Sequence, residues 1–222
     1  MKRVYLLVEG QSEEAFVREL LVPHYSRSGL YLTPIIVNTS PGHRGGIVSY
    51  AKIKPQLQRL CRQDAGAYVS TMFDLYALPQ DFPGKTAATY PANGSGHQKA
   101  MFLEVQLAQD IGLNNFIPNL MVHEFEALLF VQLEKFAEWT DTQSVVTRLR
   151  ANARGHAPED INDDPMTAPS KRILSAMPNY QKTFHGPLIT CEVGLDALRA
   201  ACPHFHGWLQ KLEVLATPQT IS

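Results

Sequence analysis

The sequence predicts an α/β fold, in which a central, mostly parallel sheet is flanked by helices and is followed by a helical C-terminal elaboration. Short apolar runs alternate with helical patterns in the first part of the chain, which is typical of parallel strands joined by helices. The first run, residues 4–8, is apolar throughout, as expected of a strand buried on both faces. Since 222 residues can hold one core with an appendage, we expect an α/β core at 1–126 and a mainly helical extension, packed on it, at 127–222.

The opening unit is a strand, a turn and a helix. Residues 4–8 form the strand, Gly10 permits a sharp turn, and Ser12 is placed to cap a helix with Phe16 on its apolar face. A second strand is expected at residues 32–37.

The remaining elements follow from the same patterns. A loop at 39–46 leads to a helical pattern that contains Pro55, and a third strand at 67–73 ends at Asp74. A long irregular segment then leads to a helix at about 101–111 and to a fourth strand at 116–122. The later helical candidates lie at 128–139, 143–153, 170–177 and 195–215.

The composition is that of an ordinary globular protein, with 45% hydrophobic and 18% charged residues. The net charge of -1 lacks the basic excess that indicates general nucleic-acid binding, so a polyanion would need a local basic patch, a metal ion or a partner. Cys61, Cys191 and Cys202 form neither a zinc motif nor a disulfide framework. The apolar run at 4–8 is too short for a signal peptide or membrane span, so we expect a cytoplasmic location and no membrane contact.

Three carboxylates follow predicted strands directly: Glu9, Asp74 and Glu124. The carboxyl ends of parallel strands meet at one edge of a sheet, where ligands bind. Carboxylates gathered there repel one another unless a cation lies among them, and oxygen ligands suit Mg²⁺, Mn²⁺ or Ca²⁺. The pattern therefore predicts a divalent-metal site. Glu13, four residues after Glu9, is a candidate ligand for a second metal ion.

Each of these acids also has an ordinary structural interpretation, as a solvated loop charge or a helix N-terminal charge. In the segment HEFEALLF, Glu124 and Glu126 are two residues apart, so on a helix they would face different ways. We expect only one of them to reach the site and favour Glu124. His123 is a candidate metal ligand or proton acceptor, with a hydrogen-bonded structural role as the alternative.

Two basic segments are candidates for phosphate contact. The loop SPGHRGG combines glycine backbone N–H groups with Arg44. Lys171 and Arg172 follow Ser170, which is placed to cap a helix, and Lys171 is the candidate for stabilising charge in a transition state. The alternative is a surface segment whose charges pair locally.

The segments VEGQSEEAFV, TMFDLYALPQDFPG, HEFEALLF, EDIND with TAPSKR, and CPHFHGWL together resemble domain of unknown function family 4276 over nearly the whole chain. That family is similar to the TOPRIM domain of overcoming-lysogenization-defect nucleases, which has a Rossmann-like sheet. The resemblance implies a nuclease dependent on Mg²⁺ or Mn²⁺, with metal ligands at Glu9, Glu13, Asp74 and Glu124 and a catalytic Lys171. It also implies nucleic acid as substrate and an ATPase partner in phage defence.

The sequence departs from the TOPRIM pattern at Tyr76, which stands where a second aspartate is expected. A phenol is a poor Mg²⁺ ligand, so Tyr76 suits a hydrogen bond to phosphate or to Asp74, and Asp81 or Glu126 is then the candidate for the missing charge. This departure leaves a second hypothesis open, a non-catalytic binding or regulatory subunit of an ATPase complex with a vestigial metal site. A third is another TOPRIM-like phosphotransfer, such as RNA maturation or primer synthesis.

Overall fold

The fold is seen in a computed structural model of the chain. It describes residues 1–40, 43–44, 46–47, 49–76, 78–140, 143–161 and 166–216, with the backbone alone at 39, 40, 43, 44 and 143. Within these residues, five strands form one parallel sheet in the order β2-β1-β5-β6, with β7 also pairing β5. The strands are β1 (Lys2–Val8), β2 (Leu30–Ile36), β5 (Ala67–Asp74), β6 (Phe116–Ile117) and β7 (Leu120–Met121). The predicted α/β class is confirmed.

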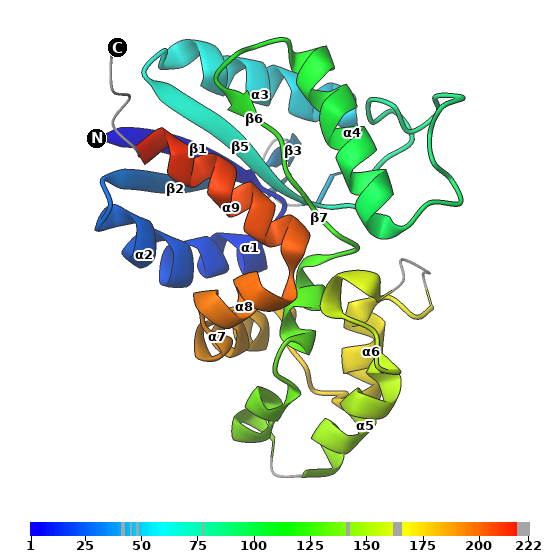
Figure 1. Cartoon of the computed structure of the whole chain (residues 1–222). Helices are drawn as coiled ribbons and strands as arrows, with labels where there is room; N and C mark the ends of the chain where they lie inside the picture. Colours follow the sequence, from blue (N-terminus) through cyan, green and yellow to red (C-terminus); the bar gives the residue numbers. More distant parts are fainter. Residues whose placement is uncertain are drawn as a thin grey trace.

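Residues of β1 alternate between two hydrophobic clusters, because successive side chains of a strand point to opposite faces. Leu6 and Val8 pack on one face with Phe16 and Trp208. Leu7 packs on the other face, with residues of α3 (Tyr50–Gln63) and α4 (Gly96–Ile111). The sheet therefore lies between two helical layers, with α3 and α4 on one side and α1, α2 and α9 on the other (Figure 1).

The first helix runs on through a π-helical turn, as α1 (Gln11–Phe16), η1 (Val17–Leu21) and α2 (Val22–Ser26). It begins at Gln11 with Gly10 as its N-cap and no side-chain cap bond, so the prediction that Ser12 caps it is wrong. The predicted fourth strand is divided into β6 and β7, since Pro118 between them has no N–H to donate to a ladder.

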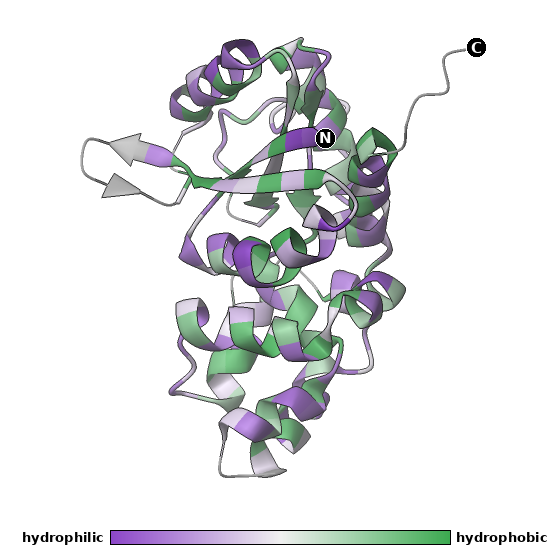
Figure 2. Cartoon of the chain, turned by 90° about the vertical axis from the view of Figure 1, so that its left-hand side faces the viewer, coloured by the Kyte–Doolittle hydropathy of each residue, from purple (hydrophilic) through white to green (hydrophobic). Residues whose placement is uncertain are grey.

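The segments after residue 124 are helical, and in Figure 1 they build the lower half of the molecule, except for the last helix, α9, which lies along the sheet. Apolar and polar stretches alternate along these helices, as amphipathic packing requires (Figure 2). In chain order they are η2 (Phe125–Phe130), η3 (Leu133–Trp139), α5 (Gln143–Ala153), η4 (Pro158–Asp160), α6 (Pro169–Ala176), α7 (Lys182–Val193), α8 (Leu195–Ala201) and α9 (Pro203–Ala216). The helix α7 was not expected from the sequence.

A short antiparallel pair, β3 (Asn38–Ser40) and β4 (His43–Arg44), lies in the predicted 39–46 loop. The side chain of Arg44, a candidate phosphate contact, lies outside the described residues. Among the described residues, no helix combines the length and the apolar character needed to cross a bilayer.

Candidate metal centre

An acidic cluster lies at the carboxyl edge of the sheet. Asp74 is the last residue of β5, and Glu124 and Glu126 lie just beyond β7. One carboxylate oxygen from each of these three residues lies within 4.8 Å of the other two. Glu9, which follows β1, contacts the same place, because its Oε2 accepts a hydrogen bond from the Asp74 backbone N–H at 3.2 Å. We use the term acidic cluster for Asp74, Glu124 and Glu126.

Backbone amides hold these carboxylates in position. The Phe125 N–H donates to Asp74 Oδ1 at 2.9 Å. The Ser170 N–H, in the first turn of α6, donates to Glu124 Oε1. A carboxylate at the start of a helix is also favoured by the helix dipole. Glu9, Asp74 and Glu124 are thus each anchored by an amide of a different element.

Both glutamates of HEFEALLF reach the cluster, whereas the sequence predicted that only one would. The prediction assumed that the two lie on one helix. In the structure Glu124 is extended, with φ -156° and ψ 166°, and forms the N-cap of η2, while Glu126 lies within η2. His123, the residue before Glu124, adopts a left-handed backbone conformation with φ 66°. This change of backbone direction lets both carboxylates turn to the same side.

Burial and mutual repulsion raise the pKa values of these acids. Burial, followed by the charges of Glu9 and Glu13, raises the pKa of Asp74 well above its usual value. Burial is also the largest cause for Glu126 and for Glu13, raising the pKa of each to about 7. The Glu13 carboxylate has room beside the turn because Gly10 has no Cβ. A Cβ at this position would lie only 3.3 Å from Glu13 Oε2. The group therefore favours uptake of a proton or a cation.

Lys182 pairs with two acids of the cluster, and no pattern in the sequence pointed to it. It opens α7, and its Nζ lies 2.9 Å from Glu126 Oε1 and 3.9 Å from Glu124 Oε2. Burial lowers the pKa of Lys182, but Glu126 and Glu124 outweigh this effect and raise it. Its side chain is 48% exposed, so the ammonium group is fixed by the acids yet accessible from solvent.

The predicted basic residues lie elsewhere on α6. Lys171 is exposed and lines a shallow hollow of about 140 Å³ together with Asn152 and Arg172. The Arg172 guanidinium donates to the backbone oxygens of Thr167, at 2.6 Å, and of Asn152. These contacts tie α6 to α5, so Arg172 has a structural role in this arrangement.

The other candidates lie around the cluster. Tyr76 is half-buried and its backbone N–H donates to the His123 oxygen at 2.8 Å. His123 is buried, with Nε2 3.1 Å from the backbone oxygen of Glu159. Asp81 instead accepts hydrogen bonds from Ser49 Oγ and from the N–H groups of Tyr50 and Ala51, at the start of α3. Of the two candidates for the charge missing at Tyr76, Glu126 is thus the one that joins the cluster.

Tyr180 adds a buried hydroxyl beside the acids. Burial raises its pKa, and the charges of Glu126, Glu124 and Glu13 raise it further. No hydrogen-bond partner for this hydroxyl occurs among the described residues. Gly186 on α7 lies against it, since a Cβ there would be 3.1 Å from the Tyr180 oxygen. The site thus has an unused hydrogen-bonding group next to its carboxylates.

Fold and site together define an α/β protein with buried carboxylates gathered at the carboxyl edge of a parallel sheet. The chain belongs to the family described as DUF4276, a domain of unknown function, which matches residues 8–213. The membership that the quoted motifs predicted is therefore confirmed.

Two solved structures of the C-terminal region of the Xanthomonas campestris pv. campestris OLD protein are similar to this chain. The one phased with iodine is 15% identical, with a TM-score of 0.40, over 97% of this chain and 98% of that chain. The one phased with platinum is 14% identical, with a TM-score of 0.36, over 96% and 97%. Among curated proteins, none matches the sequence.

Proposed function

We propose that this protein is a nuclease that hydrolyses phosphodiester bonds of DNA or RNA and depends on Mg²⁺ or Mn²⁺. The observation that carries the proposal is the gathering of three carboxylates within 4.8 Å of one another, with Glu126 and Glu124 almost fully buried. Buried like charges are unfavourable unless a cation or protons compensate them. Oxygen ligands of this kind suit a hard divalent cation.

The donor set fits such an ion. Asp74, Glu124 and Glu126 would hold it, and Glu9 and Glu13 lie close enough to add to the negative charge around it, as their effect on the pKa of Asp74 indicates. A divalent ion bound there would polarise a phosphate and make an attacking water more acidic. In the metal-free protein the neighbouring acid Glu13, which is not among these three ligands, has a pKa of about 7, within the range in which a carboxylate can accept a proton during reaction.

Lys182 supplies the positive charge that phosphoryl chemistry needs from the protein. Its ammonium group contacts Glu126 and is partly exposed, so a phosphate that approaches the acids meets it. A fixed cation beside a developing negative charge lowers the barrier of such a reaction. We therefore assign to Lys182 the charge-stabilising role that the sequence analysis gave to Lys171. The Tyr180 hydroxyl is buried beside the acids and would hydrogen-bond a water molecule held within the site.

The test is cleavage of labelled single-stranded and double-stranded DNA and RNA by the purified protein. The reactions contain Mg²⁺, Mn²⁺ or a chelator, each with and without a candidate ATPase, the partner that the family resemblance implies. Asp74→Asn is compared with Asp160→Asn, which removes an exposed carboxylate on η4. Cleavage is expected to need the metal and to disappear only in Asp74→Asn. Cleavage that continues in chelator, or in Asp74→Asn, would refute the proposal.

A second candidate function is a binding or regulatory subunit whose metal site does no chemistry. Tyr76 favours it, since a tyrosine stands where a second carboxylate is expected in TOPRIM nucleases. In that case Mn²⁺ binds the wild type more tightly than Asp74→Asn, while no nucleic acid is cleaved with or without the ATPase. Equal Mn²⁺ binding by the two proteins would eliminate the metal site itself.

A further inference from the structure

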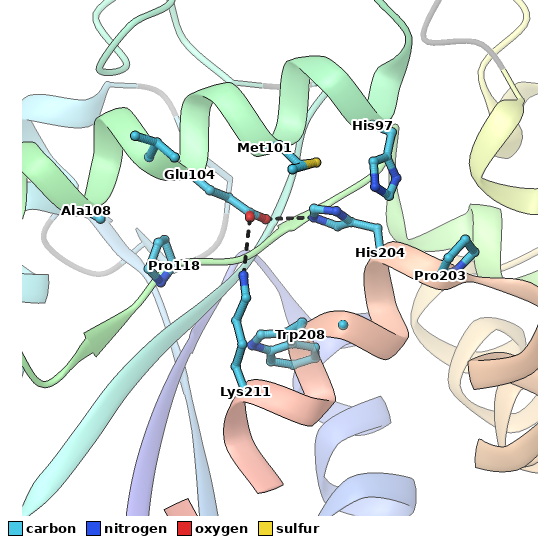
Figure 3. A pocket seen from close by; sticks show the side chains of 11 residues that line it. His97, Met101, Glu104, Ala108, Pro118, Pro203, His204, Trp208 and Lys211 are labelled. Carbon is cyan, nitrogen blue, oxygen red and sulfur yellow. Dashed lines mark hydrogen bonds and ion pairs between the residues drawn. The ribbon is translucent and has the colours of Figure 1, made fainter. Parts of the chain in front are cut away.

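A second site lies between α4 and α9, away from the acidic cluster. It is a pocket of about 310 Å³, a volume at the lower end of the range for small-molecule sites. Figure 3 shows the Glu104 carboxylate inside it, between His204 and Lys211. The walls are formed mainly by rings and apolar side chains, namely His97, Met101, Pro118, Pro203 and Trp208.

Glu104 is the polar centre of this pocket. It is a carboxylate with only 5% of its surface exposed. Its Oε1 accepts a hydrogen bond from the Leu120 N–H at 2.9 Å and lies 2.7 Å from His204 Nε2. Its Oε2 faces Lys211 Nζ at 3.9 Å, which is beyond hydrogen-bond distance. One oxygen is therefore fixed by the protein, and the other remains able to accept a hydrogen bond from a ligand.

The walls are flat and held in place. The His97 and His204 rings meet edge to face, with centroids 4.8 Å apart. The Trp208 indole N–H donates to Ser70 Oγ on β5 at 2.9 Å, and because Trp208 is only 1% exposed it supports the pocket from behind. His97 is the half-buried ring among these walls, so a planar ring can stack on it, and aromatic stacking favours a flat ligand over a branched aliphatic one.

Gly207 contributes to the open space. It lies inside α9, where glycine is less favourable than alanine by about 1 kcal/mol. Close packing does not require it, because a Cβ at this position would meet nothing within 4 Å. Gly207 lines the pocket, so any larger side chain there would project into the open volume.

We propose that this pocket binds a nucleobase that carries an exocyclic amino group, which donates a hydrogen bond to Glu104 Oε2. A cationic ligand suits the site less well, because the Lys211 ammonium group already pairs with the carboxylate and His204 Nε2 contacts it at 2.7 Å. A neutral N–H donor on a flat ring matches both Glu104 Oε2, which Lys211 approaches only to 3.9 Å, and the His97 ring. The Lys211 side chain is 55% exposed at the same place and can meet the phosphate of the nucleotide.

The base has two possible sources, a free nucleotide or an unstacked base of a nucleic-acid strand. The second source rests on the proposed nuclease function. Close packing joins the pocket to the acidic cluster, since a Cβ at Gly96, beside His97, would lie 2.5 Å from the His123 ring, next to Glu124. Glu159 also contacts both regions, through the His204 N–H at 2.9 Å and His123 Nε2.

Cytidine and uridine monophosphate form the matched pair of ligands, because at ring position 4 cytosine has an amino group where uracil has an oxygen. Binding is measured by calorimetric titration in chelator, so that no strand is cleaved. Trp208 fluorescence in Trp139→Phe gives a second readout, since the chain has two tryptophans. We expect cytidine monophosphate to bind about tenfold more tightly, because an unmatched buried acceptor disfavours uracil.

Two variants test the pocket separately. Glu104→Gln keeps an oxygen for the Leu120 N–H and places an amino group where Oε2 was, so the preference should shift toward uridine monophosphate. Gly207→Phe fills the space without touching Glu104 and should abolish binding of both ligands. Since its Cβ meets nothing, this variant should fold, as thermal unfolding will show. Equal binding of the two ligands by the wild type, or unchanged binding by Gly207→Phe, would overturn the proposal.

Oligonucleotides of cytosine and of uracil distinguish the two sources. If the cytosine strand binds more tightly than the free nucleotide, the ligand is a base of a strand, and otherwise it is a free nucleotide. Asp74→Asn separates this proposal from the proposed function, because it should retain the cytosine preference while losing cleavage. A wild type that cleaves nucleic acid but binds cytidine and uridine monophosphate equally would refute the proposal for the pocket and leave the proposed nuclease function standing.

Discussion

The acids of the site place like charges in a space that excludes most of the surrounding water. Folding raises the pKa of Glu13 from 4.5 to about 7, chiefly through burial, so the folded chain holds a proton that the unfolded chain releases. Stability from this group is fully present below about pH 4.5 and is lost as the pH rises through about 7. The metal-free protein should therefore lose stability over this interval.

Glu13→Gln should reduce that loss. The contribution of a shift of this size is about 3 kcal/mol at most, from about 1.4 kcal/mol per pKa unit. The measurement is urea unfolding in chelator at several pH values, with Glu14→Gln as the control, since Glu14 pairs with Arg18 at the surface. If the unfolding free energies of the wild type and Glu13→Gln have the same pH dependence, folding does not raise the pKa of Glu13. Mn²⁺ should remove most of the loss in the wild type.

Lys182 and Lys171 are the two candidates for stabilising negative charge in the transition state. Lys182→Met should lower the single-turnover cleavage rate by about 100-fold, the usual effect of removing one such group. Lys171→Met should change it by less than about threefold, because Lys171 is exposed beside Arg172 and Asn152. A larger loss in Lys171→Met would restore the role that the sequence analysis predicted for it.

The place of Glu9, Asp74 and Glu124 at the edge of the sheet was predictable because each follows an apolar run, whereas Glu126 gave no such signal. Glu9 directly follows β1 and Asp74 is the last residue of β5, two strands whose central side chains are buried on both faces, and this position alone places them at one edge of the sheet. Lys182 gave no such signal. It is brought to the cluster by the packing of α7 against α1 and η2, which no local pattern shows.

At the scale of elements, α9 is held by a side chain from another helix. The Glu159 carboxylate accepts hydrogen bonds from the N–H groups of His204 and Phe205, at 2.9 and 3.0 Å, and so caps the start of α9. Glu159→Ala should lower the free energy of unfolding by about 1–3 kcal/mol, since two buried N–H groups lose their partner. Asp160→Ala, at the exposed neighbouring position, should change it by less than about 0.5 kcal/mol.

Urea unfolding of these two variants tests the cap. Equal effects would mean that water replaces the Glu159 carboxylate at the start of α9.

Some elements could not be predicted from local sequence. Gly186 and Pro187 lie inside α7, and both disfavour a helix interior, so the segment gave no helical signal. Tertiary contacts explain the glycine, because a Cβ at 186 would lie 3.1 Å from Phe125 and from Tyr180. The division of the fourth strand is different, since Pro118 was visible in the sequence and marks the break.

At the scale of the whole molecule, the sheet and the C-terminal helices share one hydrophobic core. Phe205, Trp208 and Leu212 of α9 pack in the same cluster as Val4 and Leu6 of β1. The proposed division at residue 126 therefore separates two parts that bury each other. A fragment of residues 1–126 should leave one face of the sheet exposed.

That fragment should show no cooperative thermal unfolding by circular dichroism, whereas the whole chain should. Adding residues 127–222 as a separate fragment should restore the transition if the two parts associate. A cooperative transition in the first fragment alone would show that the core is independent of its extension.

The amide anchors of the acidic cluster also bear on when the site forms. The bonds from Asp74 N to Glu9, from Phe125 N to Asp74 and from Ser170 N to Glu124 span 65, 51 and 46 residues. Lys182 follows all of them along the chain. During synthesis, then, the acids are made first, but the helix that orients Glu124 and the lysine that faces it come later. The site cannot be complete until Lys182 has been synthesised, when most of the chain has already been made. The order of translation therefore delays any activity until the fold is nearly finished.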